Sequence, residues 1–243
     1  MSAIQYSWAE NPREVARNLT ESLLDLYEES DKHPFFVALS GGATPASLFN
    51  YWKGFPELIM EKDIHFFWVD ERMVPVESED SNYGSAFRQF FGKVNFPVER
   101  LHPILYKSAK SVEEIAREYN ELVHKMCADT DRSYLFDVAI LGMGLDGHTS
   151  SLFPGQDLER EGDDYIPSIH PDNGVERVAL SLSGIENCKS IYMHVLGDDK
   201  ASRLAQVWNQ SHGERAEEVL PAAVALRVAE HATIFTDIRG NLE

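Results

Sequence analysis

The stretch FDVAILGMGLDGHTSSLFPG, residues 136–155, decides the fold, because an apolar run ends there abruptly in a glycine-rich, polar turn. Residues 138–141 have the length and β-branched content of a strand that is buried on both faces, as in parallel sheets. Because α/β folds bind ligands at the carboxyl ends of parallel strands, Asp146 and His148 lie where a site is expected. The alternative is an ordinary turn, in which Asp146 caps the next segment and His148 is solvated.

Strand-like apolar runs alternate with helical patterns on both sides of this stretch. The other expected strands are residues 35–39, 64–69, 101–106, 177–183, 190–196 and 232–236, and helices are expected from residues 12, 45, 82, 112, 201 and 221. Residues 156–174 are polar and contain proline, which predicts a long loop and a candidate lid. The alternation, without a linker or a repeat, predicts one α/β domain over residues 1–243, a three-layer α/β/α fold with a largely parallel, Rossmann-like sheet.

The segment SGGATP, residues 40–45, directly follows the first of these strands. Thr44 is expected to cap a helix, so Ser40, Gly41 and Gly42 lead into a helix amino terminus. Such a terminus offers unpaired N–H groups and a positive dipole end to a phosphate. The alternative is a tight turn that needs glycine for a positive φ. The segment is neither a dinucleotide fingerprint nor a Walker loop, which disfavours a nucleotide-binding oxidoreductase.

Charged residues follow two further strands. Asp70, Glu71 and Arg72 form either a solvated rim or a cluster that faces the cleft. Asn82, further along, either contacts a ligand or caps a helix. Asp198 or Asp199 is expected to cap the helix that carries Ala201, which places Lys200 in its first turn. The helix dipole disfavours a cation there, so an anion ligand is a better interpretation of Lys200 than a helix stabiliser. Polar clusters thus follow four strands, at residues 40–42, 70–72, 146–148 and 197–200. If the strands are parallel, all four clusters meet at one sheet edge, which favours a joint site.

The composition excludes several classes of function. A formal net charge of −18 disfavours nucleic acid and anionic membranes as partners, and an anion-binding protein this acidic must concentrate its cations locally. Cys127 and Cys188 are isolated, which disfavours zinc and disulfides and predicts two buried apolar side chains. The sequence shows no basic-then-apolar leader and no apolar run of membrane-spanning length, so a cytoplasmic protein is expected. No feature indicates an oligomeric state.

Several segments together resemble the 6-phosphogluconolactonases, in the order expected for that family. These segments are LSGGATP, WVDERMVP followed by DSNYG, GMGLDGHTSSLFPG, ERVALSL and LGDDK. Met143 and Ser150 are mild variants of the expected residues. The resemblance implies hydrolysis of 6-phosphoglucono-δ-lactone in the oxidative pentose phosphate pathway, without a metal or a redox cofactor.

The resemblance also implies roles for individual residues. His148 resembles the general base, and Asp146 either orients it or holds a sugar hydroxyl. The implied phosphate and substrate contacts are Ser40, Gly41, Gly42, Arg72 and Lys200, with Arg177 as a weaker candidate and Thr44 and Asp70 as further substrate-binding candidates. A lactone is an activated acyl group, so a histidine that removes a proton from water contributes roughly 10²–10⁴-fold. Such a base predicts activity that falls below about pH 6.5. Arg72 or loop amides are expected to stabilise the oxyanion.

Two other functions compete with this interpretation. Glucosamine-6-phosphate deaminases are similar in fold and also carry SGG and DGH segments. That family has an acidic residue at the position of Phe153 in this chain, and an aromatic residue at the position of Arg72 in this chain. Both departures favour the lactonase. A non-catalytic sugar-phosphate sensor would keep the phosphate loop and lose the base, and the presence of His148 beside Asp146 speaks against it.

Overall fold

A parallel sheet forms the centre of the molecule, for which a computed structural model describes residues 4–31, 33–42, 44–156, 158 and 162–240. All pairs of neighbouring strands in this sheet run parallel within the described residues. Its strands, in spatial order, are β1 (Gln5–Trp8), β10 (Ala232–Thr236), β9 (Ile191–Val195), β6 (Val138–Gly142), β2 (Phe35–Leu39), β3 (Ile64–Trp68) and β5 (Leu101–His102). The predicted parallel sheet is therefore confirmed.

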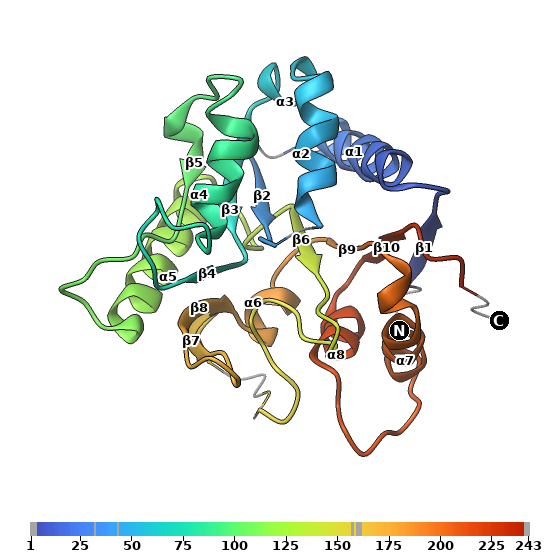
Figure 1. Ribbon diagram of the computed structural model, residues 1–243. Helices are drawn as coiled ribbons and strands as arrows, with labels where there is room; N and C mark the ends of the chain where they lie inside the picture. Colours follow the sequence, from blue (N-terminus) through green and yellow to red (C-terminus); the bar gives the residue numbers. More distant parts are fainter. Residues whose placement is uncertain (1–3, 32, 43, 157, 159–161, 241–243) are drawn as a thin grey trace.

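Helices cover both faces of this sheet. Figure 1 shows α1 and α2 over one face, and α6, α7 and α8 over the opposite face. The helices are α1 (Pro12–Glu29), α2 (Pro45–Gly54), α3 (Glu57–Met60), α4 (Asn82–Ala86), α5 (Val112–Asp129), α6 (Leu182–Glu186), α7 (Ala201–Ser211) and α8 (Pro221–Val228), with short turns η1 (Phe87–Phe91), η2 (Val98–Arg100) and η3 (Asp198–Lys200). Both faces of the central strands are buried, so β2 is apolar throughout and β9 is apolar except at His194. This arrangement confirms the three-layer prediction.

The helix starts follow the capping signals in the sequence. Asn11 accepts a hydrogen bond from the Glu14 N–H at 3.1 Å, and α1 begins at the next residue, Pro12. Ser111 and Glu114 form a reciprocal capping box at the start of α5. These caps satisfy N–H groups that have no partner within the helix.

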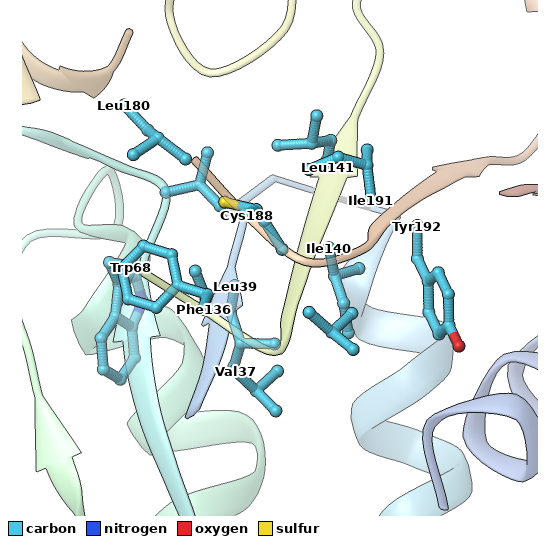
Figure 2. Close-up of a cluster of buried hydrophobic side chains, with 14 of the residues drawn as sticks. Val37, Leu39, Trp68, Phe136, Ile140, Leu141, Leu180, Cys188, Ile191 and Tyr192 are labelled. Carbon is cyan, nitrogen blue, oxygen red and sulfur yellow. The ribbon is translucent and has the colours of Figure 1, made fainter. Parts of the chain in front are cut away.

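The core lies between the central strands and their covering helices. Figure 2 shows side chains of β2, β6 and β9 packed together, with Trp68 of β3 and Cys188 among them. Cys127 and Cys188 are both free thiols and both buried, as predicted. Burial raises the pKa of the Cys127 thiol to about 11, which disfavours the reactive thiolate.

A second, antiparallel sheet lies beside the first, and the sequence analysis did not predict it. Its strands, in order, are β4 (Asp70–Arg72), β8 (Glu176–Leu180) and β7 (Tyr165–Ile169). The predicted loop 156–174 is therefore wrong in part, because it contains β7; its residues 157 and 159–161 lie outside the described residues. The strand predicted to reach residue 183 ends at Leu180, because Ser181 caps α6 by accepting from the Gly184 N–H at 3.1 Å.

The strand order reverses between β2 and β6. From β2 the chain proceeds outward through β3 and β5, and from β6 it proceeds the other way through β9 and β10. Loops at such a reversal diverge and leave a crevice at the carboxyl ends of the strands. In the described residues, no helix is long and apolar enough to cross a membrane.

Candidate active site

A cavity of about 230 Å³ opens at the carboxyl edge of the parallel sheet, where the strand order reverses. The predicted residues that line it are Ser40, Gly41, Gly42, Thr44, Asp70, Arg72, His148, Arg177 and Lys200. Asn82, expected either to contact a ligand or to cap a helix, also lines the cavity, and the further lining residues are Gly142, Met143, Gly144, Ser150 and Ser151. The remaining predicted residue, Asp146, adjoins the cavity through its bond to His148. The structure thus brings all four polar clusters to one cavity.

His148 and Asp146 form a hydrogen-bonded pair. His148 Nδ1 lies 2.6 Å from Asp146 Oδ1, and the backbone N–H of His148 donates to the same oxygen at 3.1 Å. Burial would raise the pKa of Asp146, but the hydrogen bonds from His148 outweigh it and lower the pKa to about 2. With an ionised carboxylate as the acceptor, the ring hydrogen belongs on Nδ1. The Nε2 atom is then the one that can accept a proton.

The turn around His148 depends on close contacts. A Cβ atom at Gly144 would lie 2.2 Å from His148 Nδ1, so only glycine leaves room for the imidazole. The Phe153 ring packs against the His148 ring with centroids 4.9 Å apart, and Phe153 itself is buried. No helix follows the turn directly; Thr149 and Leu152 instead form an isolated β-bridge. The alternative of an ordinary turn is correct in that Asp146 caps the segment by accepting from the His148 N–H, and wrong in that His148 is not merely solvated but lines the cavity.

Arg177, Ser151 and Asp70 form a buried polar chain. Ser151 Oγ donates to Asp70 Oδ2 at 2.5 Å, and Arg177 Nη1 donates to Ser151 Oγ at 3.1 Å. Arg177 Nη1 lies 3.9 Å from Asp70 Oδ2. Ser150 and Ser151 have φ values of +51° and +56°, an uncommon conformation that turns Ser151 towards Asp70. The sequence analysis missed Ser151 because no local pattern signals this backbone turn.

The two cavity arginines carry unused hydrogen-bond donors. Among the described residues, the Nε atoms of Arg72 and Arg177 are buried and lack a hydrogen-bond partner. Arg72 Nη1 donates to the Asp80 carbonyl at 2.7 Å. Burial and the neighbouring Arg72 lower the pKa of Arg177, and Asp70 only partly offsets them. Both Nε atoms are shielded from solvent, so what the two guanidinium groups offer the cavity is positive charge, which an anionic group would satisfy.

Lys200 adds a third cation to the cavity. Its Nζ donates to the Met143 carbonyl at 2.7 Å, on the strand-end loop that leads to His148. Burial lowers the pKa of Lys200, and Asp199 counteracts this effect. The prediction that Asp198 or Asp199 caps the following helix is wrong, because no side chain caps η3 or α7.

The SGG loop lies directly against Asn82. A Cβ atom at Gly41 would lie 1.8 Å from Asn82 Oδ1, so glycine permits this approach. Asn82 Nδ2 donates to the Asp70 carbonyl at 2.8 Å. Gly42 has a φ of +92°, which favours glycine. Pro45 begins α2 as predicted, but Thr44 does not cap it: Thr44 has helical backbone angles and no capping hydrogen bond from its side chain.

Glu71 organises the loop that supplies Arg72 and Asn82. It is 2% exposed and is not part of a solvated rim. Its carboxylate accepts hydrogen bonds from the backbone N–H groups of Arg72, Asn82 and Tyr83, at 2.8, 2.7 and 2.8 Å, and from the Ser81 hydroxyl at 3.1 Å. Burial raises the pKa of Glu71, although the three N–H groups oppose this shift.

The sequence profile of the glucosamine-6-phosphate isomerases/6-phosphogluconolactonase family matches residues 10–235. A 6-phosphogluconolactonase of Haemophilus influenzae is 35% identical over 177 residues, which cover 72% of this chain and 74% of the relative. One of Treponema pallidum is 30% identical over 203 residues, with 82% and 83% covered.

The fold of this chain is also similar to solved structures. The 6-phosphogluconolactonase from Trypanosoma brucei superposes with a TM-score of 0.78 at 26% identity, over 97% of each chain. The structure of a devB protein gives a TM-score of 0.82 at 29% identity, over 96% of each chain. The similarity thus extends over nearly the whole chain.

Proposed function

This chain belongs to the glucosamine-6-phosphate isomerase/6-phosphogluconolactonase family, and from this premise we propose that it hydrolyses 6-phospho-D-glucono-1,5-lactone to 6-phospho-D-gluconate. The observation that carries the proposal is the His148–Asp146 pair, which adjoins a cavity that also contains Arg72 and Arg177. A proton acceptor and an anion-binding group are the two parts that hydrolysis of a phosphorylated lactone requires. The reaction is a step of the oxidative pentose phosphate pathway.

In the proposed mechanism, His148 Nε2 removes a proton from water while the water oxygen bonds to the lactone carbonyl carbon. The tetrahedral intermediate collapses by breaking the bond from that carbon to the ring oxygen, and the imidazolium returns its proton to the ring oxygen. Asp146 keeps the Nδ1–H in place and stabilises the imidazolium between the two steps. No covalent nucleophile is needed, because a lactone is already an activated acyl group.

The cations of the cavity have the proposed role of holding the phosphate. Arg72 and Arg177 bring guanidinium groups, and Lys200 brings an ammonium group, to the same cavity. Guanidinium donors bind phosphate oxygens in fixed directions, so they also orient the lactone relative to His148. The proposed contacts to the sugar and its oxyanion are Ser40, Gly41, Gly42, Thr44 and Asp70.

We also propose that residues 1–243 form one catalytic domain. The family profile covers residues 10–235, and apolar residues from Ala9 to Ile238 belong to one connected buried cluster. A cytoplasmic location stays a prediction. The proposed ligand is a small phosphorylated lactone, and neither nucleic acid nor a membrane is a proposed partner.

The substrate is tested by following the decay of freshly generated 6-phosphogluconolactone with the purified protein, in the presence of a chelator. We expect clear acceleration over the spontaneous rate. The same preparation is incubated with glucosamine 6-phosphate, from which we expect no ammonia. Ammonia release without lactone hydrolysis would identify a deaminase. Binding of 6-phosphogluconate by a protein inert towards both compounds would identify a sensor.

A further inference from the structure

The turn that carries Asp146 and His148 is held by hydrogen bonds to its backbone carbonyl groups, from the cavity and from outside it. Three alternate carbonyl groups of this turn each accept a hydrogen bond from the region of α7 and α8. The three contacts are Lys200 Nζ to Met143 at 2.7 Å, Arg203 Nε to Leu145 at 3.1 Å and the Ala222 N–H to Gly147 at 3.1 Å. Two of the donors are cationic side chains, and only one of these, Lys200, lines the cavity.

Arg203 is itself fixed on α7. Its Nη1 donates to Gln206 Oε1 at 2.9 Å and lies 4.0 Å from Glu218 Oε2. Its aliphatic stem packs on the turn, since a Cβ atom at Gly147 would lie 3.3 Å from Arg203 Cδ. Gly147 has a φ of +86°, so the turn passes Arg203 in a conformation that favours glycine. Arg203 therefore contacts the turn through both its charge and its stem.

Leu220 also packs on the turn at Gly147 and Phe153 packs on His148, so the part of the turn with the least other support is its outer part, at Leu145. Leu145, the residue whose carbonyl Arg203 binds, is 59% exposed. The internal bonds of the turn run from the Gly144 N–H to the His148 carbonyl and from the Gly147 N–H to the Gly144 carbonyl. The Thr149 hydroxyl donates to the Gly142 carbonyl at 2.7 Å and ties the base of the turn to β6, so the part that Arg203 holds is the outer part, at Leu145. A misplacement of about 1 Å at a reacting group can cost roughly 10²-fold in rate.

We propose that Arg203 is a positioning residue for His148. It contacts neither the cavity nor the imidazole, and it acts by holding the Leu145 carbonyl so that the Asp146–His148 pair keeps its orientation. The proposal rests on the proposed function, because it assigns Arg203 a part in the step that His148 performs.

The test compares R203A and R203K with R215A, which removes an exposed arginine from the connection between α7 and α8. In R203A we expect kcat to fall about tenfold with KM within about twofold, because orientation is lost and phosphate binding is kept. R203K should keep an intermediate kcat, and millimolar methylguanidine should restore part of the R203A activity. R215A should match the wild type.

Two further results separate positioning from simple destabilisation. In the H148A background, R203A should have no further effect on rate, because the group that Arg203 orients is gone. Long-range proton–nitrogen correlation spectra should show the Nδ1–H tautomer of His148 in the wild type and a mixture in R203A. This readout decides the matter even if the protein proves inert towards the lactone. An unchanged kcat together with an unchanged tautomer in R203A would overturn the proposal.

Discussion

The burial of His194 lowers the stability of the fold, because its polar ring is buried without hydrogen-bond partners. His194 is 1% exposed on β9, and within the described part of the chain both of its ring nitrogens lack a hydrogen-bond partner. Burial, reinforced by the charge of Lys200, lowers its pKa to about 3. Between about pH 6.5 and pH 3, the unfolded state therefore binds a proton that the folded state does not. Stability contributed by neutral His194 is complete above pH 6.5 and is lost as the pH falls through this window.

We predict that H194L stabilises the protein. Leucine removes two unpaired polar atoms, so the free energy of unfolding should rise by about 1 kcal/mol at pH 8. The gain should be larger at pH 5, because the wild type alone pays the proton linkage there. Urea denaturation at the two pH values measures both effects, with H231L at an exposed histidine as the control. A gain that is equal at both pH values would contradict the linkage.

At the scale of single residues, the sequence predicted the residues that line the site better than the residues that contact and support them. His148 and Asp146 are two residues apart, and they follow a glycine-rich strand end, which is a pattern that indicates a site. Ser151 and Glu71 act through contacts with residues distant in sequence or through a turn with positive φ. Neither kind of contact leaves a periodic signal in the sequence.

At the scale of elements, the small antiparallel sheet could not be predicted from the sequence pattern. β4 is only three residues long and entirely charged, so it shows no apolar alternation. β7 contains Pro167, which argues against a central strand but is tolerated here because β7 lies at the sheet edge. β1 was also missed, because its four residues QYSW form no apolar run. The strands buried on both faces were predicted because burial selects mostly apolar residues, despite His65 on β3 and His194 on β9.

The link between β4 and α4 gives a prediction at this scale. In the wild type, both carboxylate oxygens of Glu71 accept hydrogen bonds from backbone N–H groups. In E71Q, an NH₂ group replaces one of these oxygens, so a donor faces a donor. We expect a loss of about 2 kcal/mol in stability. KM should rise more than kcat falls, because Arg72 and Asn82 line the cavity from this loop.

Thermal unfolding and steady-state kinetics measure both effects. E79Q is the matched control, because it makes the same chemical change at an exposed position nearby. Kinetics of E71Q equal to those of E79Q would show that Glu71 does not set the loop.

At the scale of the whole molecule, the net charge of −18 opposes an anionic substrate that the cavity attracts. Raising the ionic strength from 10 to 150 mM shortens the Debye length from about 30 to about 8 Å, which screens the distant surface charges. The cavity cations are screened less, because Arg177 is buried and Arg72 and Lys200 are partly buried. We predict that kcat/KM for the lactone rises about two- to fivefold over this range. A steady fall would show that the cavity cations dominate even the long-range approach.

The most direct test of the account compares the wild type with H148A in the decay of freshly generated 6-phosphogluconolactone, with binding of 6-phosphogluconate measured on both proteins. If His148 activates water, the wild type accelerates decay and H148A loses about 10²-fold or more of that rate. H148A should still bind the product within about threefold of the wild type, because the phosphate contacts remain. Equal acceleration by both proteins would contradict the account and remove His148 as the base.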